Sequence, residues 1–123
     1  MPEHAHALTR RLVTGVVLVA CGLLVGCAPA ARISSGPVRT NQVDLPPSYQ
    51  FAPASIEVRA GSMVAWTNHD NFSHSIEVQG QTEVHMLRPG ESTQITFDQP
   101  GTYPYVCTLH TQNMRGTVVV TAA

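Results

Sequence analysis

Short runs of alternating apolar residues, separated by turn residues, occupy the chain from Val43 to Ala123. Successive side chains on a strand point to opposite faces, so this period of two predicts strands with one buried face. No stretch after Val43 sustains the spacing of an amphipathic helix. The alternating pairs are Ile56 and Val58, Val64 and Trp66, Ile76 and Val78, Ile95 and Phe97, and Val118 and Val120. We therefore predict an all-β domain of about six or seven short strands, arranged as a two-sheet sandwich or barrel.

The N-terminal segment has a different composition. A start that carries Arg10 and Arg11 leads into the uncharged run 12–25, which is too short to span a bilayer comfortably and suits a signal-peptide core. The run ends in Leu24-Val25-Gly26-Cys27, which resembles a bacterial lipobox, where the cysteine receives lipid and becomes the mature N-terminus. We expect residues 1–26 to be a lipoprotein signal peptide and Cys27 to be lipidated.

Other interpretations of this segment stay open. Ordinary secretory cleavage near residues 28–31 and a retained membrane anchor both fit an apolar run of this kind. The pair Arg10 and Arg11 also resembles a twin-arginine export signal, so the export route is not fixed by the sequence.

Residues 27–42 are mostly small or polar, contain Pro and Gly and show no periodicity, and we expect them to form a flexible tether. The folded domain is then expected at 43–123, lipid-anchored at the outer face of the cytoplasmic membrane. From Val43 onward the chain has three arginines, no lysine and seven acidic residues. This balance lacks the basic footprint of a nucleic-acid-binding protein.

Candidate metal ligands gather at one turn between strands. Cys107, His110 and Met114 lie within eight residues, and His74 follows an earlier turn. One thiolate, two imidazoles and one weak thioether are the donors of a blue-copper site, where sulfur favours Cu(I) and imidazole accepts Cu(II). Taken singly, each residue has an ordinary explanation, such as a buried free cysteine or a core methionine.

Strand parity also bears on Cys107. Tyr103, Tyr105 and Cys107 share one face of a strand, so Cys107 points into the sandwich if the tyrosines do. Pro104 lies on the opposite face and lacks a backbone N–H, which favours an edge strand or a bulge.

Together these segments resemble the cupredoxins, and within them the plastocyanin and amicyanin-like group. The resemblance covers roughly residues 49–121. The matching segments are Phe51-x-Pro53-x-x-Ile56-x-Val58, Gly61-x-x-Val64-x-Trp66-x-Asn68, His74, Pro89-Gly90-Glu91-Ser92, Pro100-Gly101-Thr102-Tyr103 and the loop after Cys107. The resemblance implies a Greek-key β-sandwich of about seven to eight strands that holds one copper ion.

Carried over by position, His74, Cys107 and His110 correspond to strong equatorial ligands and Met114 to a weak axial ligand. Two positions depart from the family pattern. Three residues separate His110 from Met114, fewer than in plastocyanin-like loops and more than in amicyanin-like ones. Ser75 replaces a common asparagine, and we expect its hydroxyl to reach the cysteine loop near Thr108.

Three further groups resemble metal ligands but are expected to lie in solvent without a fixed metal: His69, His85 and Met86. The last two are adjacent in an expected exposed loop. We expect Trp66 to belong to the core rather than to relay electrons. No disulfide is expected, because Cys21 falls in the signal peptide, Cys27 receives lipid and Cys107 binds copper.

The resemblance implies a monomeric carrier of single electrons rather than an enzyme. The imidazole of His110 would reach the surface through an apolar patch to which Leu109 and Met114 contribute. A redox protein or a membrane respiratory complex would be the transient partner. An extracytoplasmic copper carrier or scavenger is the alternative, suggested by the pair His85 and Met86 and by the tether. A sandwich without metal is a third hypothesis.

Overall fold

The computed structural model describes residue 26 and residues 36–123. This part of the chain contains nine strands and no helix, so the prediction of an all-β fold is confirmed. The strands are β1 (Val38–Arg39), β2 (Gln42–Leu45), β3 (Ser55–Arg59), β4 (Ser62–Asn68), β5 (His74–Val78), β6 (Val84–Leu87), β7 (Ser92–Phe97), β8 (Gly101–Val106) and β9 (Arg115–Thr121). Among these residues no helix is long and apolar enough to cross a membrane. The predicted signal peptide, apart from Gly26, and Cys27 lie outside the described residues.

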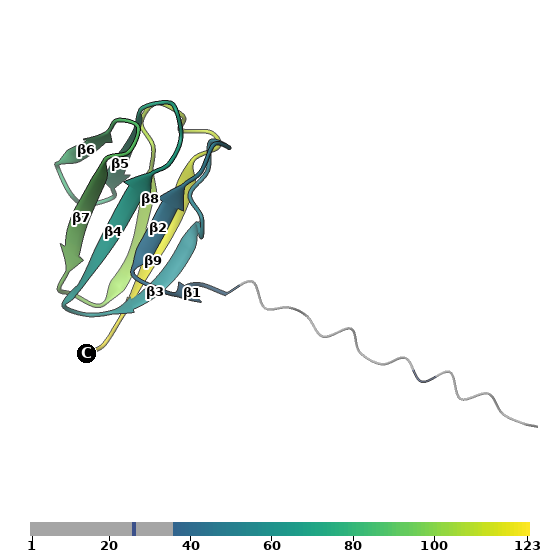
Figure 1. Ribbon diagram of the computed structural model, residues 1–123. Helices are drawn as coiled ribbons and strands as arrows, with labels where there is room; N and C mark the ends of the chain where they lie inside the picture. Colours follow the sequence, from purple (N-terminus) through teal and green to yellow (C-terminus); the bar gives the residue numbers. More distant parts are fainter. Residues whose placement is uncertain (1–25, 27–35) are drawn as a thin grey trace, which may run out of the picture. The chain divides into compact units, whose positions relative to one another are not determined.

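Two sheets stack face to face, as Figure 1 shows. The larger has the strand order β1-β3-β9-β8-β5-β6, and the smaller has the order β2-β4-β7. β3 pairs in parallel with β9, whereas β9 and β8 are antiparallel. The mixed order brings β5 beside β8, and these two strands carry the site described below.

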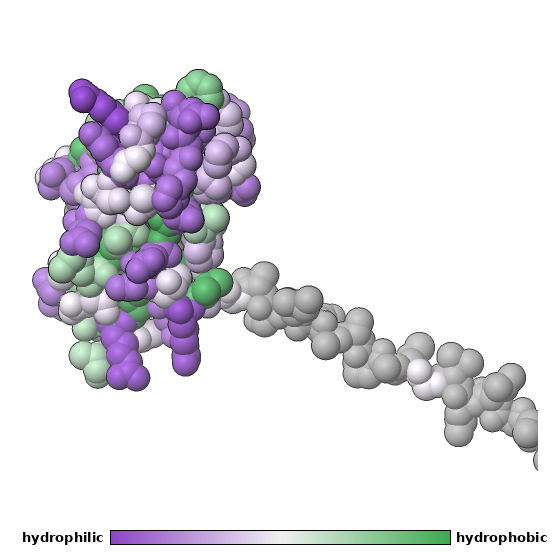
Figure 2. Space-filling model, in the orientation of Figure 1, coloured by the Kyte–Doolittle hydropathy of each residue, from purple (hydrophilic) through white to green (hydrophobic). Residues whose placement is uncertain are grey.

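The core between the sheets includes every residue of the five alternating pairs that the sequence selects. Trp66 is fully buried and packs edge-on against Tyr105 at 5.4 Å between ring centroids. Cys107 belongs to the same apolar cluster, so the prediction that it points inward with Tyr105 is confirmed. Burial raises the pKa of Tyr105, and its hydroxyl donates to the carbonyl of Ala54 at 3.1 Å. The surface of the domain differs in composition from this core, because Figure 2 shows hydrophilic and hydrophobic residues interspersed on it.

The ordered domain starts earlier than residue 43. β1 and β2 lie wholly or partly within the segment expected to be a tether, and the boundary at Val43 cuts through β2. Val43 and Leu45 are buried, and β2 pairs in parallel with β4 so that Val43 lies opposite Trp66. Pairing with a distant strand therefore orders a segment whose composition alone favours a linker.

The expectation of an exposed loop at His85 and Met86 is wrong. Both lie in strand β6, where neighbouring side chains point to opposite faces. Met86 is exposed, whereas His85 is half-buried and its Nδ1 lies 3.1 Å from the hydroxyl of Thr93 on β7.

The expectation of an edge strand or bulge at Pro104 also needs correction, because β8 lies between β9 and β5. β5 pairs with β8 only at Val106 and Tyr105, and the carbonyl of Pro104 accepts from the amide of Gln79 just beyond β5. In an antiparallel strand the nitrogen and carbonyl of one residue face the same side. The missing N–H of Pro104 therefore faces Gln79, and the ladder between β5 and β8 ends there, whereas the pairing of β8 with β9 continues through Pro104.

Candidate metal centre

Three separate points of the fold bring His74, Cys107 and His110 together. His74 opens β5, Cys107 follows β8, and His110 lies in the loop between β8 and β9. Their donor atoms all lie within 4.8 Å of one another. Cys107 Sγ is 3.9 Å from His74 Nδ1 and 3.6 Å from His110 Nδ1. Both imidazoles thus turn the same nitrogen toward the sulfur.

The loop from Cys107 to Met114 is closed by its own backbone. The amide of Cys107 donates to the carbonyl of Met114 at 3.0 Å, and the amide of Met114 donates to the carbonyl of His110 at 3.0 Å. Met114 is fully buried in the cluster that contains Cys107. The expectation that Met114 adds to a surface patch is therefore wrong. Leu109, the other residue expected in that patch, is 53% exposed.

His74 is oriented by a buried carboxylate. Its Nε2 lies 2.8 Å from Asp70 Oδ2, and both side chains are almost completely buried. The hydrogen bond from His74 lowers the pKa of Asp70, so the carboxylate is ionised and can only accept. Nε2 of His74 must then carry the proton, which leaves the lone pair of Nδ1 facing the sulfur of Cys107.

The turn that carries Asp70 is organised by Asn68. The side-chain amide of Asn68 donates to the carbonyls of Phe72 and Leu87 at 2.8 and 3.1 Å, and its oxygen accepts from the amide of Asp70 at 2.9 Å. Asn68 is completely buried. Its three bonds tie the turn between β4 and β5 to the end of β6 and so fix the approach of His74.

The sulfur of Cys107 accepts hydrogen bonds from Ser75. The amide of Ser75 donates to Cys107 Sγ at 3.3 Å, and the hydroxyl lies 3.8 Å from the same sulfur. Ser75 Oγ also accepts from the amide of Thr108 at 2.8 Å and lies 2.7 Å from its hydroxyl. The structure thus places Ser75 and Thr108 in the contact that the sequence led us to expect.

The donor set fits a metal ion. A sulfur and a nitrogen that share one ion, with bonds of about 2.3 and 2.0 Å, are separated by about 3.5 Å at a tetrahedral angle and about 3.7 Å at a trigonal angle. The two sulfur–nitrogen distances here are 3.6 and 3.9 Å. Two imidazoles, one thiolate and a weakly bound thioether are the donors that copper electron-transfer sites use.

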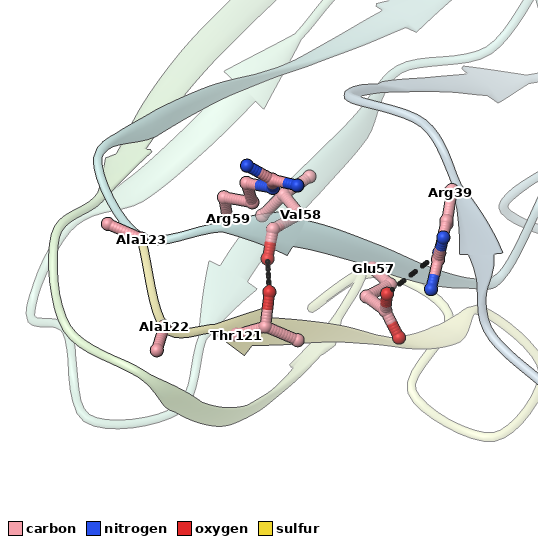
Figure 3. Close-up of a pocket in the computed structure, with 7 residues that line it drawn as sticks. All are labelled: Arg39, Glu57, Val58, Arg59, Thr121, Ala122 and Ala123. Carbon is pink, nitrogen blue, oxygen red and sulfur yellow. Dashed lines mark hydrogen bonds and ion pairs between the residues drawn. The ribbon is translucent and has the colours of Figure 1, made fainter.

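Within the described residues this is the one group of three or more His, Cys, Asp or Glu side chains placed to share an ion. His69 is exposed and pairs with Asp44 at 2.9 Å. A surface pocket lined in part by Thr121 lies near the end of β9, whereas the metal centre lies at the start of that strand. Figure 3 shows this pocket with Arg39 paired to Glu57, and it contains no residue of the metal centre.

Comparison with known proteins agrees with this geometry. Residues 16–120 match the cupredoxin-like domain family. The chain is 30% identical over 119 residues to amicyanin-alpha of Methylorubrum extorquens, covering 90% of this chain and 98% of that protein. It is 36% identical over 83 residues to plastocyanin of Scenedesmus fuscus, covering 57% and 85%. The purple cupredoxin of Nitrosopumilus maritimus aligns with a TM-score of 0.61 at 26% identity, covering 65% of this chain and 98% of that one. The chain therefore belongs to the cupredoxin-like domain family.

Sequence reasoning missed Asp70 and Tyr49. The carboxylate of Asp70 stands four residues before His74, a spacing that is too common to indicate a partner by itself. The ring of Tyr49 contacts both imidazoles from a segment with no regular pattern.

Proposed function

We propose that the protein is a type 1 copper protein that carries single electrons between redox partners at the outer face of the cytoplasmic membrane. The observation that carries this proposal is the cluster of His74, Cys107 and His110, with Met114 buried at the end of the same loop, in a chain of the cupredoxin-like family. In this proposal the first three residues are strong ligands and Met114 is the weak axial ligand.

Copper, when bound, supplies a one-electron couple between Cu(II) and Cu(I). The side chains of this protein hold their positions through the fold itself. Asp70 fixes the ring of His74, and the amide of Ser75 fixes the sulfur of Cys107. Four protein donors leave no open position of the kind that a catalytic metal keeps for substrate. We therefore propose a carrier rather than an enzyme.

The two imidazoles differ in their access to solvent. His74 is fully buried, whereas His110 is half-buried beside the exposed side chain of Leu109. We propose that electrons enter and leave through His110. The partner is a redox protein or a membrane respiratory complex, and the encounter is small and transient, as is usual for such pairs.

The proposed location rests on the N-terminal sequence alone. The charged start, the apolar run and the lipobox-like Leu24-Val25-Gly26-Cys27 support export and a lipid anchor at Cys27. Mass spectrometry of the membrane-extracted protein tests this. A mature N-terminus other than a lipid-bearing Cys27 would refute the anchor and leave the copper site unaffected.

The visible spectrum tests the copper site. The copper-loaded protein should show an intense thiolate-to-copper band, and Cys107→Ser should abolish the band, because an oxygen replaces the thiolate sulfur that lies within 4.8 Å of both imidazoles. A wild-type Cu(II) form without the band would sink the proposal.

The copper-carrier alternative loses one of its two motives in the structure. It was suggested by the pair His85 and Met86 and by the tether, but the two side chains lie on opposite faces of β6 and do not form an adjacent pair of donors. We therefore keep electron transfer as the single proposed function.

A further inference from the structure

The two histidines of the metal centre are held in different ways. Nε2 of His74 has a carboxylate partner, Asp70, at 2.8 Å. The imidazole of His110 has, within the described residues, no hydrogen-bond partner apart from the sulfur of Cys107. A ligating histidine ordinarily has its second ring nitrogen fixed by an outer partner. Another contact must therefore orient His110.

The aromatic ring of Tyr49 makes that contact. Its centroid lies 4.7 Å from the centroid of His110, and the two planes meet at 69°. This is an edge-to-face arrangement within the favourable range for aromatic pairs. The same ring lies 6.0 Å from His74 at 86°, so one side chain touches both imidazoles.

Tyr49 is held in a conformation that is unusual for its residue type. Its φ is 52°, in the left-handed region that residues other than glycine rarely adopt. Such backbone persists where the surroundings fix it, and it gathers at functional sites.

Two features of the fold supply that fixation. The segment before β3 is fastened by backbone bonds of 2.8 Å in both directions between Asp44 and Ala52. The ring of Tyr49 also stacks on Phe72 at 5.9 Å. The ring is therefore restrained by its stacking on Phe72 and by the fastening of its own segment of chain.

We propose that Tyr49 is a positioning residue that orients the imidazole of His110. It does for His110 what Asp70 does for His74, but through ring packing in place of a hydrogen bond. A ring contact leaves the outer nitrogen of His110 unbonded, so the edge of the imidazole stays available to a partner. This inference rests on the proposed function, in which His110 is both a ligand and the site of electron exit.

The experiment is nitrogen-15 NMR of the histidine rings in the copper-free full-length chain. The main variant is Tyr49→Gly, because glycine adopts a φ of 52° without strain and the change removes only the ring. We expect a roughly two- to tenfold rise in the population of alternative His110 ring orientations, the size of effect that one lost aromatic pair gives. His74 should be unchanged, and Tyr49→Phe should match the wild type.

Leu109→Ala is the matched control. Leu109 adjoins His110 and is 53% exposed, but it has no aromatic ring. The proposal is overturned if His110 in Tyr49→Gly behaves as in the wild type, if Tyr49→Phe loosens His110 as much as glycine does, or if Leu109→Ala has the same effect. The first result would show that the Tyr49 ring does not restrain His110. The second would assign the restraint to the Tyr49 hydroxyl, and the third would show that any loss of a side chain near His110 loosens it.

Failure of this inference is distinguishable from failure of the proposed function. The ring measurement uses the copper-free chain, whereas the function is tested by the visible band of the copper-loaded wild type. A wild type without the band refutes the function whatever the rings do. If the wild type shows the band and the His110 ring orientations do not change in Tyr49→Gly, only the positioning role is refuted.

Discussion

Replacing Asp70 with alanine should weaken copper binding while leaving the fold intact. The carboxylate is buried and its Oδ2 lies 2.8 Å from Nε2 of His74. Without it, the protonated nitrogen loses its partner and both ring orientation and tautomer of His74 become free. Outer partners of ligating histidines typically contribute about 10- to 100-fold in metal affinity. This corresponds to about 1.4 to 2.8 kcal/mol of binding free energy.

The assay is a competition titration of the protein against a chromophoric copper chelator, for Cu(I) and Cu(II) separately. Asp70→Asn should fall between the wild type and alanine, because the amide oxygen still accepts from His74 but carries no charge. Circular dichroism should show the same strand content in all variants.

Asp44→Ala is the matched control, because Asp44 and His69 form a second Asp–His pair at 2.9 Å. That pair is more than half exposed, and exposed pairs contribute little. We expect its copper affinity to stay within about twofold of the wild type. Equal affinities of Asp70→Ala and wild type, in a folded protein, would refute the assigned role of the carboxylate.

Four further outcomes are expected. First, the pKa of Asp70 is lowered from its ordinary value of 3.8 by the hydrogen bond from His74, so its carboxylate stabilises the copper-free fold above that pH and ceases to do so as the pH falls below it. Urea titrations at several acidic pH values should show this loss, and Asp70→Ala should lack it. Second, Asn68→Ala removes three hydrogen bonds of a buried side chain and should lower the free energy of unfolding by about 2 to 4 kcal/mol, and a change below about 1 kcal/mol would contradict the role of this side chain. Third, Gly116→Ala places a Cβ against the buried ring of Tyr105 and a backbone carbonyl, so thermal unfolding should show a loss of about 1 to 3 kcal/mol or more. Fourth, Met114→Leu nearly preserves the side-chain volume and should cost less than about 1.5 kcal/mol, yet it removes the thioether. The copper-loaded variant should therefore keep the visible band with a changed reduction potential, and an unchanged potential would argue against Met114 as axial ligand.

The strands that the sequence predicts share a local cause. Ile56 and Val58, or Val118 and Val120, alternate within one strand, and each pair enters the core. The grouping of Cys107, His110 and Met114 is also local, because one loop carries all three. Periodicity and spacing therefore suffice to predict most of the sandwich and three of the candidate donors.

The strands that the sequence missed depend on partners far along the chain. β2 offers only two inward side chains, and its place is set by pairing of Val43 with Trp66. β6 is too short for its alternation to be noticed, and His85 is held by Thr93 on another strand. Such strands form because they hydrogen-bond to backbone groups of a neighbouring strand. That strand is distant in the sequence, so the local residue pattern cannot predict the pairing.

The same distinction applies to the residues around the metal centre. Asp70 and His74 are close in sequence, but an acidic residue four positions before a histidine forms a strong orienting pair only when both side chains are buried away from water. Tyr49 is 25 positions before His74 and reaches it through a turn with left-handed backbone. The sequence indicates the candidate donors because one Cys, two His and one Met at this spacing are an uncommon combination. Asp70 and Tyr49 are common residue types whose role depends on where the fold places them.

The supports also explain why this arrangement suits electron transfer. Asp70 fixes His74, the amide of Ser75 fixes the sulfur of Cys107, and packing in the apolar cluster fixes Met114. All of these interactions lie within the protein, so the fold itself sets the spacing of the donors. A donor set held in this way moves little when the charge at its centre changes by one, and a small rearrangement is what rapid transfer of one electron requires. His110 is the exception, since it is half-buried and held mainly by a ring contact. Of the four donors, the one that we propose faces the partner therefore has the weakest support, and the rate of electron exchange should be more sensitive to Tyr49 than to the carboxylate that contacts His74.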